Sequence, residues 1–179
     1  MKNVKTASLL RFSGVLAAAA LLLPVAASAG SATGTLSVSA SVSQNCTIAA
    51  ASLGFGSYDP IVANVSAALN ASQSLTFTCT KGSTPVYVTA NTGSNGNSGG
   101  ACSTTRSMKS GSNVLCYELY TDSNHTNVWN TTNNGTNDYQ PTFASSHTAT
   151  ATVYGQIPGA QDATVGASYT DSVTMTINF

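Results

Sequence analysis

Tyr169-Thr-Asp-Ser-Val-Thr-Met-Thr-Ile-Asn-Phe179, the last eleven residues of the sequence, alternate between apolar and polar side chains. Successive side chains of a strand point to opposite faces, so this pattern predicts a half-buried β-strand. Because no further strand follows Phe179 in the sequence, we expect the edge of this strand to be exposed. The apolar face of that edge comprises Val173, Met175, Ile177 and Phe179.

A second alternating stretch, Leu36-Ser-Val-Ser-Ala-Ser-Val42, lies near the other end of the chain. A free strand at one end and an exposed edge at the other are what head-to-tail assembly by strand addition requires. The alternative is an ordinary first strand of the chain's own sheet. Only sixteen positions separate Gly30 from Cys46, too few for two full strands, which favours a donor strand. Its apolar face comprises Leu36, Val38, Ala40 and Val42.

The first 29 residues have the pattern of a secretory signal. A basic start precedes an apolar run, Val15–Leu23, that is too short to span a bilayer, and Ala27-Ser28-Ala29 supplies a small-x-small cleavage signature. We expect cleavage after Ala29, with an uncleaved amphipathic anchor as the alternative. No later apolar run is long enough for a transmembrane helix, so we expect an exported protein that is not inserted in a membrane.

The mature chain is poor in charge. Removing the signal takes away three of the six basic side chains and leaves three basic against six acidic residues, a net charge of −3. Such a balance offers no electrostatic footprint for nucleic acid or anionic lipid. We therefore expect no nucleic-acid partner.

Short alternating runs separated by polar turns recur through the mature chain, and no helical period is visible outside the signal. About 150 residues suit one domain, and the pattern predicts a β-sandwich or barrel. Two polar loops, 92–100 and 130–138, lack apolar side chains, and we expect the first to be an untethered tip. The predicted strands are Thr35–Val42, Cys46–Ala50, Leu53–Phe55, Gln73–Cys79, Val86–Asn91, a short one at Met108, Leu115–Thr121, Val128–Trp129, Ala149–Gln156 and Ser172–Phe179.

Four cysteines in an exported chain indicate two disulfides. The sequence allows three pairings, and we choose the sequential, un-nested one, Cys46–Cys79 with Cys102–Cys116. A metal site is not expected, because there is no CxxC pair and both histidines lie apart from the cysteines in sequence.

Aromatic residues could form a sugar-binding platform, but they are spread over different strands and are better explained by core packing. Trp129, beside a polar loop, is the best candidate for exposure. The aromatic residues considered are Phe55, Tyr58, Phe77, Tyr117, Tyr120, Trp129 and Tyr154.

Catalytic patterns are missing from the sequence. It contains no GxSxG, HExxH or Gly-rich phosphate loop. Glu118 and Asp122 are the carboxylates nearest to each other around a strand, but Asp122 is better interpreted as a turn residue than as half of a glycosidase pair. We predict no enzyme activity, no catalytic residue and no cofactor.

Six stretches, taken in order, resemble one known family. They are Gly54-Phe55-Gly56-Ser57-Tyr58-Asp59-Pro60, Arg106-Ser-Met108, Leu115-Cys-Tyr117-Glu-Leu119-Tyr120-Thr121-Asp122, Val128-Trp129, Tyr154-Gly155-Gln156-Ile157-Pro158 and Gly166-Ala-Ser-Tyr169-Thr-Asp171-Ser-Val173. The first is similar to the FGxYDP signature of the spore coat protein U family, which includes subunits of archaic chaperone–usher pili. The resemblance covers nearly the whole mature chain.

The resemblance implies an all-β fold, an incomplete immunoglobulin-like Greek-key sandwich that lacks its last strand and is completed by a donor strand. It also implies three partners: a periplasmic chaperone that lends a strand and holds the carboxylate of Phe179, an outer-membrane usher, and other copies of the chain or related subunits. The expected organisation is a signal peptide at 1–29, a donor segment at 30–43 and a sandwich domain at 44–179.

Cys116 departs from the family pattern, which usually has a polar or basic residue there, and Cys102 looks like an addition. A local disulfide explains both, with a free reactive thiol pair as the alternative.

Two functions follow from these observations. The first is a structural subunit of a secreted surface fibre, polymerised by donor-strand exchange and supporting adhesion and biofilm formation. The second is a self-contained secreted coat or matrix protein that binds a surface or glycan, in which residues 36–42 pair within their own sheet.

Overall fold

The computed structural model describes residues 28–132, 138–166 and 168–179. Of the signal sequence predicted at 1–29, residues 1–27 therefore lie outside the described residues. Contacts divide the chain into a part that ends at Ala40 and a domain that spans Ser41–Phe179. Within the described ranges there is no helix. The strands are β1 (Cys46–Ile48), β2 (Leu69–Cys79), β3 (Tyr87–Ala90), β4 (Arg106–Ser110), β5 (Asn113–Tyr120), β6 (Thr148–Ile157) and β7 (Met175–Asn178).

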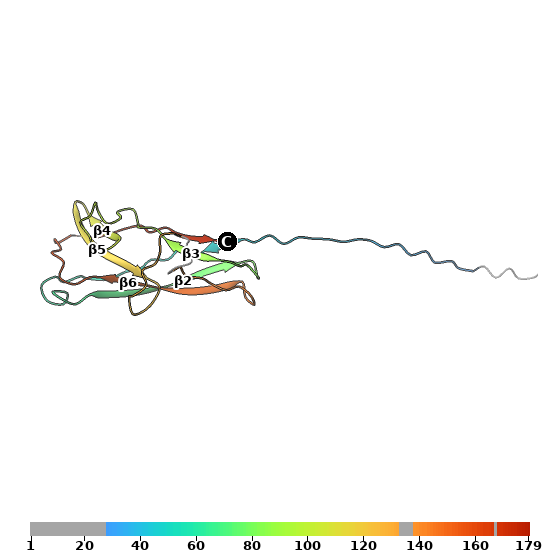
Figure 1. The fold of residues 1–179 in the computed structure, drawn as a ribbon, viewed down its shortest axis with the longest axis horizontal. Coiled ribbons are helices and arrows are strands. Elements are labelled where there is room, and N and C mark those ends of the chain that lie inside the picture. Colours follow the sequence, from blue (N-terminus) through green and yellow to red (C-terminus); the bar gives the residue numbers. More distant parts are fainter. Residues whose placement is uncertain (1–27, 133–137, 167) are drawn as a thin grey trace, which may run out of the picture. The chain divides into compact units, whose positions relative to one another are not determined.

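The strands form two antiparallel sheets. One has the order β1-β2-β6-β5-β4 and the other consists of β3 and β7. Figure 1 shows β2 and β6 side by side along the domain, with Leu69 opposite Ile157 at one end and Thr78 opposite Thr148 at the other. The order β1-β2-β6-β5 corresponds to strands A, B, E and D of an immunoglobulin constant-type sandwich, and β3 and β7 correspond to C and F. Beside β7, where such a sandwich has strand G, the described residues place no strand. The predicted all-β sandwich is confirmed.

The core lies between the sheets and follows from alternation along the long strands. In β2 and β6 every second residue points inward, because side chains of a strand alternate between its faces. Fully or nearly fully buried apolar side chains include Leu75, Phe77, Val86, Val88, Leu115, Tyr117, Leu119, Trp129, Phe143, Val153 and Ile157.

Trp129 corrects one prediction. Its side chain is fully buried, and the indole nitrogen donates a hydrogen bond of 2.8 Å to the carbonyl of Val88. The polar loop after it suggested exposure, but an indole whose N–H meets a backbone carbonyl is readily buried.

The loop 92–100 corrects another. Ser94 N donates to Ser172 O at 3.0 Å, and the side-chain amide of Asn95 donates to Thr170 O at 3.0 Å and to Asp171 Oδ1 at 3.1 Å. The prediction that nothing ties this loop down is wrong, because hydrogen bonds hold it where apolar contacts are missing.

The boundaries differ from prediction mainly at the ends of strands. β2 begins at Leu69 and not at Gln73, because its pairing with β6 continues to Ile157. Residues 53–55 and 35–42 were predicted as strands, and neither forms one.

Candidate functional site

An open apolar groove of about 430 Å³ lies beside the final strand. One wall is the segment 51–55 and the other is the chain from Tyr169 to Met175. Buried core residues form its floor. Its apolar lining comprises Ala51, Leu53, Phe55, Leu75, Met108, Tyr117, Leu119, Val153, Tyr169, Val173 and Met175.

The groove continues into a second hollow of about 1200 Å³, which shares Leu53, Phe55, Met108 and Tyr169 with it. This second hollow lies between the loops 56–65 and 160–169. The two openings together expose core side chains to solvent beside the chain that leads to the C-terminal strand.

Glycine 155 in β6 explains how the first wall is held. A Cβ atom at Gly155 would lie 2.6 Å from a methyl carbon of Leu53 and 2.7 Å from the ring of Phe55. The two side chains pack directly over the glycine, which keeps segment 51–55 against the sheet without any strand pairing.

Tyr58 joins the two loops that border the second hollow. Its hydroxyl donates to Pro158 O at 3.0 Å and accepts from Gln161 N at 3.1 Å. Asp59 Oδ1 accepts from the backbone N–H groups of Ile61 and Val62, which closes an Asx turn. The stretch that resembled the family signature thus lines the second hollow.

The backbone of the second wall is hydrogen-bonded to the rest of the domain along one edge. Ser172 O accepts from Ser94 N, and Thr174 O accepts from Asn91 N, each at 3.0 Å. β7 then pairs with β3, with Thr176 opposite Thr89 and Asn178 opposite Tyr87. The even-numbered residues of this stretch therefore direct their backbone groups toward β3 and the loop after it.

The odd-numbered residues direct theirs the other way. In an antiparallel ladder consecutive residues point their N–H and C=O groups to opposite edges. Val88 and Ala90 lie opposite Ile177 and Met175, but their N–H groups point away from β7. They donate to the carbonyls of Tyr139 and Asn130. Within the described part of the chain, no hydrogen bond engages the backbone groups of Val173, Met175 and Ile177. These groups form a free strand edge that faces the groove.

The side chains of β7 follow the predicted alternation. Val173, Met175 and Ile177 are half-buried and pack against the core, whereas Thr174 and Thr176 are exposed. Phe179, placed in the same set from the sequence, is 52% exposed. The structure thus puts Val173 and Met175 in one groove wall, packs Ile177 against the core and leaves Phe179 at the surface.

A carboxylate fixes the position of this wall. Asp171 accepts a hydrogen bond of 2.7 Å from the hydroxyl of buried Tyr117, and its other oxygen accepts from Asn95. Burial, and then the hydrogen bond to Asp171, raise the pKa of Tyr117 well above its ordinary value. Gly93 approaches so closely that a Cβ there would lie 1.9 Å from Asp171 Oδ2.

A buried ion pair lies behind the groove. The fully buried guanidinium of Arg106 contacts Glu118 and donates to the carbonyls of Ala90 at 2.7 Å and Trp129 at 3.1 Å. Glu118 Oε2 accepts from the backbone N–H of Thr105 at 2.8 Å. The pair ties β4 and β5 to the end of β3, and Glu118 has no free oxygen with which to act as a catalytic acid.

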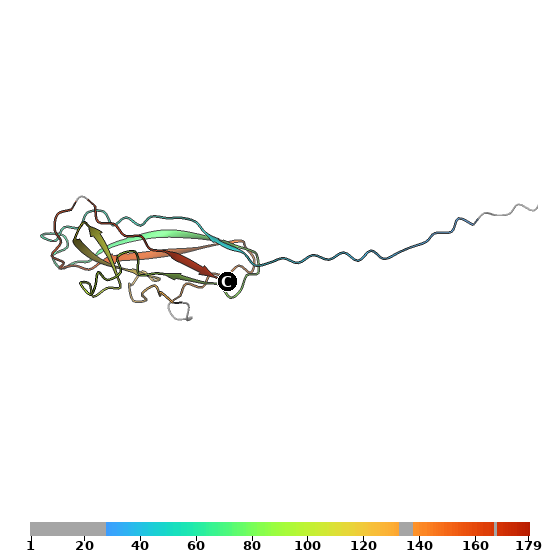
Figure 2. The same ribbon diagram turned by 90° about the horizontal axis from the view of Figure 1, so that it is seen from above.

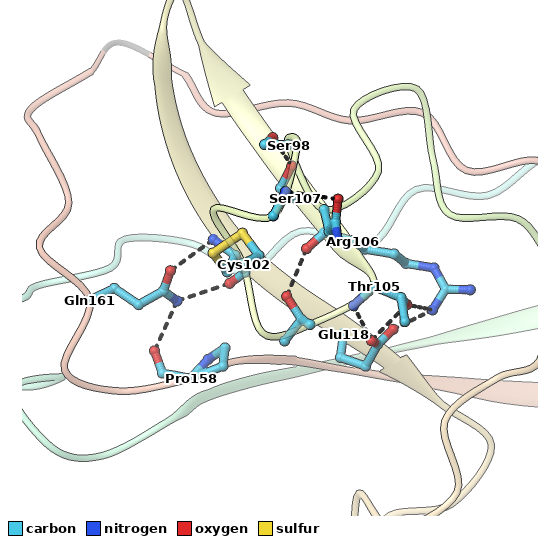
Figure 3. Close-up of a disulfide and its surroundings, with 12 residues drawn as sticks. Ser98, Cys102, Thr105, Arg106, Ser107, Glu118, Pro158 and Gln161 are labelled. Atoms are coloured by element: carbon cyan, nitrogen blue, oxygen red, sulfur yellow. Dashed lines mark hydrogen bonds and ion pairs between the residues drawn. A yellow bond between two sulfur atoms is a disulfide. The ribbon is translucent and has the colours of Figure 1, made fainter.

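Both disulfides have the sequential pairing chosen from the sequence. Cys46–Cys79 joins β1 to β2, and Cys102–Cys116 joins the loop after 92–100 to β5. Figure 3 shows the second bridge next to Gln161, whose side chain accepts from the backbone N–H of Cys116 at 2.8 Å and donates to its carbonyl at 2.9 Å. The bridge fastens β5 to the segment around Cys102, and Gln161 fastens β5 to the loop that borders the large hollow.

The predicted donor residues lie outside any strand. Leu36, Val38 and Val42 are each 84–85% exposed, and Ala40 is exposed. Leu36, Val38 and Val42 thus form an alternating row of large apolar side chains that is exposed to solvent.

Other sites receive no support. No group of three potential metal-ligating side chains occurs among the described residues. Asp122 accepts hydrogen bonds from the N–H groups of Thr126 and Asn127, as its interpretation as a turn residue implied. The described ranges contain no helix that is long and apolar enough to cross a membrane.

Sequence reasoning missed most of the groove floor and the role of Asp171. Met108, Leu53 and Phe55 were placed in strands, and nothing in their local pattern indicated that they would line an opening. The nearest available signal was Gly155 within a strand, which marks a close approach by other residues.

Comparison with known proteins supports the fold. A search of curated proteins found no match. Among solved structures, the chain is similar to the crystal structure of the CsuC-CsuE chaperone-tip adhesion subunit pre-assembly complex from archaic chaperone-usher Csu pili of Acinetobacter baumannii, with 22% sequence identity and a TM-score of 0.52. The match covers 77% of this chain and 40% of that one.

The family is established by sequence. A family model for the Spore Coat Protein U domain matches residues 32–176, well over half of the chain. The resemblance inferred from the six short stretches is therefore confirmed, and the protein belongs to the Spore Coat Protein U domain family.

Proposed function

We propose that the protein is a structural subunit of a secreted surface fibre of the archaic chaperone–usher type, polymerised by donor-strand exchange. The observation that carries the proposal is the groove beside β7, with unbonded backbone groups along one wall and core side chains along its floor. A sandwich with this opening lacks one strand, and the same chain contains a segment, residues 36–42, whose side chains alternate as in a strand.

The donor segment matches the groove in its alternation. Directly opposed residues of an antiparallel pair share a face. Inward-facing Leu36, Val38 and Val42 would therefore lie opposite the odd-numbered residues of β7, whose backbone groups are the free ones. The serines between them would face outward. Any register that places these apolar residues opposite the odd-numbered residues of β7 thus forms both the apolar contacts and the hydrogen bonds.

The energetics favour a long-lived complex. Burying each large aliphatic side chain contributes roughly 1.5–3 kcal/mol, and each ladder hydrogen bond contributes about 1 kcal/mol. Ordering the segment offsets much of this gain. Dissociation would be slow, because many contacts must open together.

The partners follow from the same groove. Before assembly an exposed apolar edge is an aggregation hazard, so a periplasmic chaperone would cover β7, with the carboxylate of Phe179 held by basic groups. An outer-membrane usher would then replace the chaperone by the next subunit. Export to the cell surface, adhesion and biofilm formation belong to this proposal, and it assigns the chain no enzyme activity.

The self-contained alternative needs residues 36–42 to pair within their own sheet. The described residues form no strand there, and the place beside β7 is open. No observation favours that alternative.

A matched pair of substitutions tests the proposal. In cells that encode the chaperone and usher, Val38→Asp places a charge in the groove and should abolish detergent-resistant polymers, whereas Ser39→Asp faces outward and should leave them intact. Deleting residues 30–42 should likewise give a chaperone-bound domain without fibres. Normal fibres from the deletion or from Val38→Asp would refute the proposal.

A further inference from the structure

We propose that successive copies in the fibre also contact each other end to end, through an apolar patch that packs against the opposite end of the next copy. The patch comprises Ile61, Val62, Val65 and Val165. The inference rests on the proposed function, because it takes the donor segment to be inserted antiparallel beside β7.

The patch is unusual for a soluble surface. Ile61 is 79% exposed, Val62 74%, Val65 55% and Val165 98%. Exposed apolar residues scattered singly need no explanation, but a cluster marks an interaction site. Three of the four also line the large hollow beneath them, so the surface is recessed and not flat.

The patch is held in shape. Asn64 O accepts from Ala160 N at 2.9 Å, which joins the two loops that carry it. The Asx turn at Asp59 fixes Ile61 and Val62. A partner would therefore meet a preformed surface, with little ordering cost on binding.

The patch lies at one end of the domain. Leu69 and Ile157, which follow and precede the two loops, pair at that end of the long strands. At the other end Cys79 pairs with Cys46, and Thr80 follows. Figures 1 and 2 both show the chain from Tyr169 running along the domain toward Phe179 at this second end. The eleven residues of β2 separate the ends by about 35 Å.

The direction of insertion decides which end the next copy meets. An antiparallel partner of β7 begins beside Phe179 and finishes beside Tyr169, close to Val165. The sandwich architecture favours this direction, because both sheets are antiparallel and strand G would complete them in the same sense. The donor therefore leaves the groove at the end that carries the patch.

The connection to the next domain has almost no slack. Only three residues separate Val42 from Cys46, and two of them, Ser43 and Asn45, are bonded to their own domain. Thr80 Oγ1 donates to Ser43 O at 3.2 Å and accepts from Asn45 N at 3.1 Å, and Thr80 N donates to Asn45 O at 2.8 Å. Three extended residues reach about 10 Å. The next domain must therefore lie directly against the end at which its donor emerges.

One pair of opposite charges can meet across this contact. Asp59 and exposed Asp162 flank the patch, and exposed Lys81 lies at the opposite end. Lys109, whose backbone pairs with Thr170, also lies near the patch, so of these two lysines Lys81 is the one at the opposite end. Because Lys81 and Asp162 lie at opposite ends of one domain, a head-to-tail contact brings them together and a symmetric one does not.

Zero-length carbodiimide cross-linking of intact native fibres, read by mass spectrometry, tests this contact. We expect a Lys81–Asp162 or Lys81–Asp59 link. Since these residues lie at opposite ends of one domain, such a link must join two copies. Lys109, whose backbone pairs with Thr170 near the patch, is the internal control, and a Lys109–Asp162 link is assigned within one copy.

Charge variants sharpen the test. Lys81→Glu alone and Asp162→Lys alone should each lower the yield of the link between positions 81 and 162. The double variant, in which the two charges are swapped, should restore that link. Ser74→Glu, on an exposed part of β2, should change nothing. Intact fibres without any link at Lys81 would overturn the inference and leave donor-strand exchange standing, whereas loss of all detergent-resistant polymers in the native chain would overturn both.

Discussion

Replacing Glu118 by glutamine should destabilise the domain severely although the change in shape is minimal. Four groups converge on the carboxylate: the guanidinium of Arg106, the backbone N–H and hydroxyl of Thr105, and the N–H of Leu119. Glutamine offers one acceptor oxygen in place of two and presents an NH₂ group to a donor. It also leaves the guanidinium buried without a counter-charge.

The magnitude follows from the burial. Arg106 has no exposed side-chain surface, and Glu118 is 4% exposed, so solvent cannot compensate the loss. Removing one partner of a buried pair typically costs about 3–5 kcal/mol, against a total stability of about 5–15 kcal/mol for a domain. For a chain of this size that corresponds to a fall in Tm of about 6–20 °C.

Thermal unfolding followed by circular dichroism measures the effect. The groove should be filled in all samples, by a copy of residues 34–42 joined after Phe179 through a short turn. Asp162→Asn, at an exposed carboxylate, is the control and should change stability by less than about 0.5 kcal/mol.

The double variant Glu118→Gln with Arg106→Met should recover part of the loss, since it removes the uncompensated charge. If Glu118→Gln were as stable as the control, the pair would not hold β4 and β5 to β3 as argued.

Two further predictions concern the wall of the groove, and a third concerns the second disulfide. Folding raises the pKa of Tyr117, so its contribution to the free energy of unfolding is fully present below pH about 10. That contribution is lost as pH rises toward the raised pKa, at about 1.4 kcal/mol per pH unit. In denaturant titrations from pH 8 to 11, the free energy of unfolding should therefore decline less steeply for Tyr117→Phe than for the native chain. Gly93→Ala, at φ 81°, should destabilise the domain by more than 1 kcal/mol, since its Cβ collides with Asp171; unchanged stability would contradict that close approach. Replacing Cys102 and Cys116 by serine should cost about 3 kcal/mol in a denaturant titration, and an unchanged midpoint would show that the bridge does not constrain the unfolded chain.

The sequence predicted the fold where its signal was periodic. Val173, Met175 and Ile177 alternate, and they line one face as expected. The strands β2 and β6 were both predicted, but their pairing was not, and β2 was predicted too short. Leu69–Ser72 are mostly small or polar residues whose strand conformation comes from the partner strand. Local pattern reports which face is buried and not how far a ladder extends.

The candidate groove was only half predictable. Its β7 wall follows from alternation, whereas the opposite wall depends on Leu53 and Phe55 packing over Gly155, a contact across 100 residues. Trp129 was misplaced for the same reason, since its burial depends on the carbonyl of Val88 and not on its polar neighbours. Long-range contacts of this kind leave little trace in local sequence.

The openness of the groove and the exposure of the donor are two parts of one physical arrangement. A domain with a strand of its own beside β7 would have no groove for the apolar row of residues 36–42 to fill. Here the apolar row Leu36, Val38 and Val42 is exposed while the odd-numbered backbone groups of β7 are unbonded. Each part is costly alone, since one exposes apolar surface and the other leaves a strand edge open. Both costs are removed when the row of one copy fills the groove of another, and the three bonded residues before Cys46 then set how closely the two copies must lie.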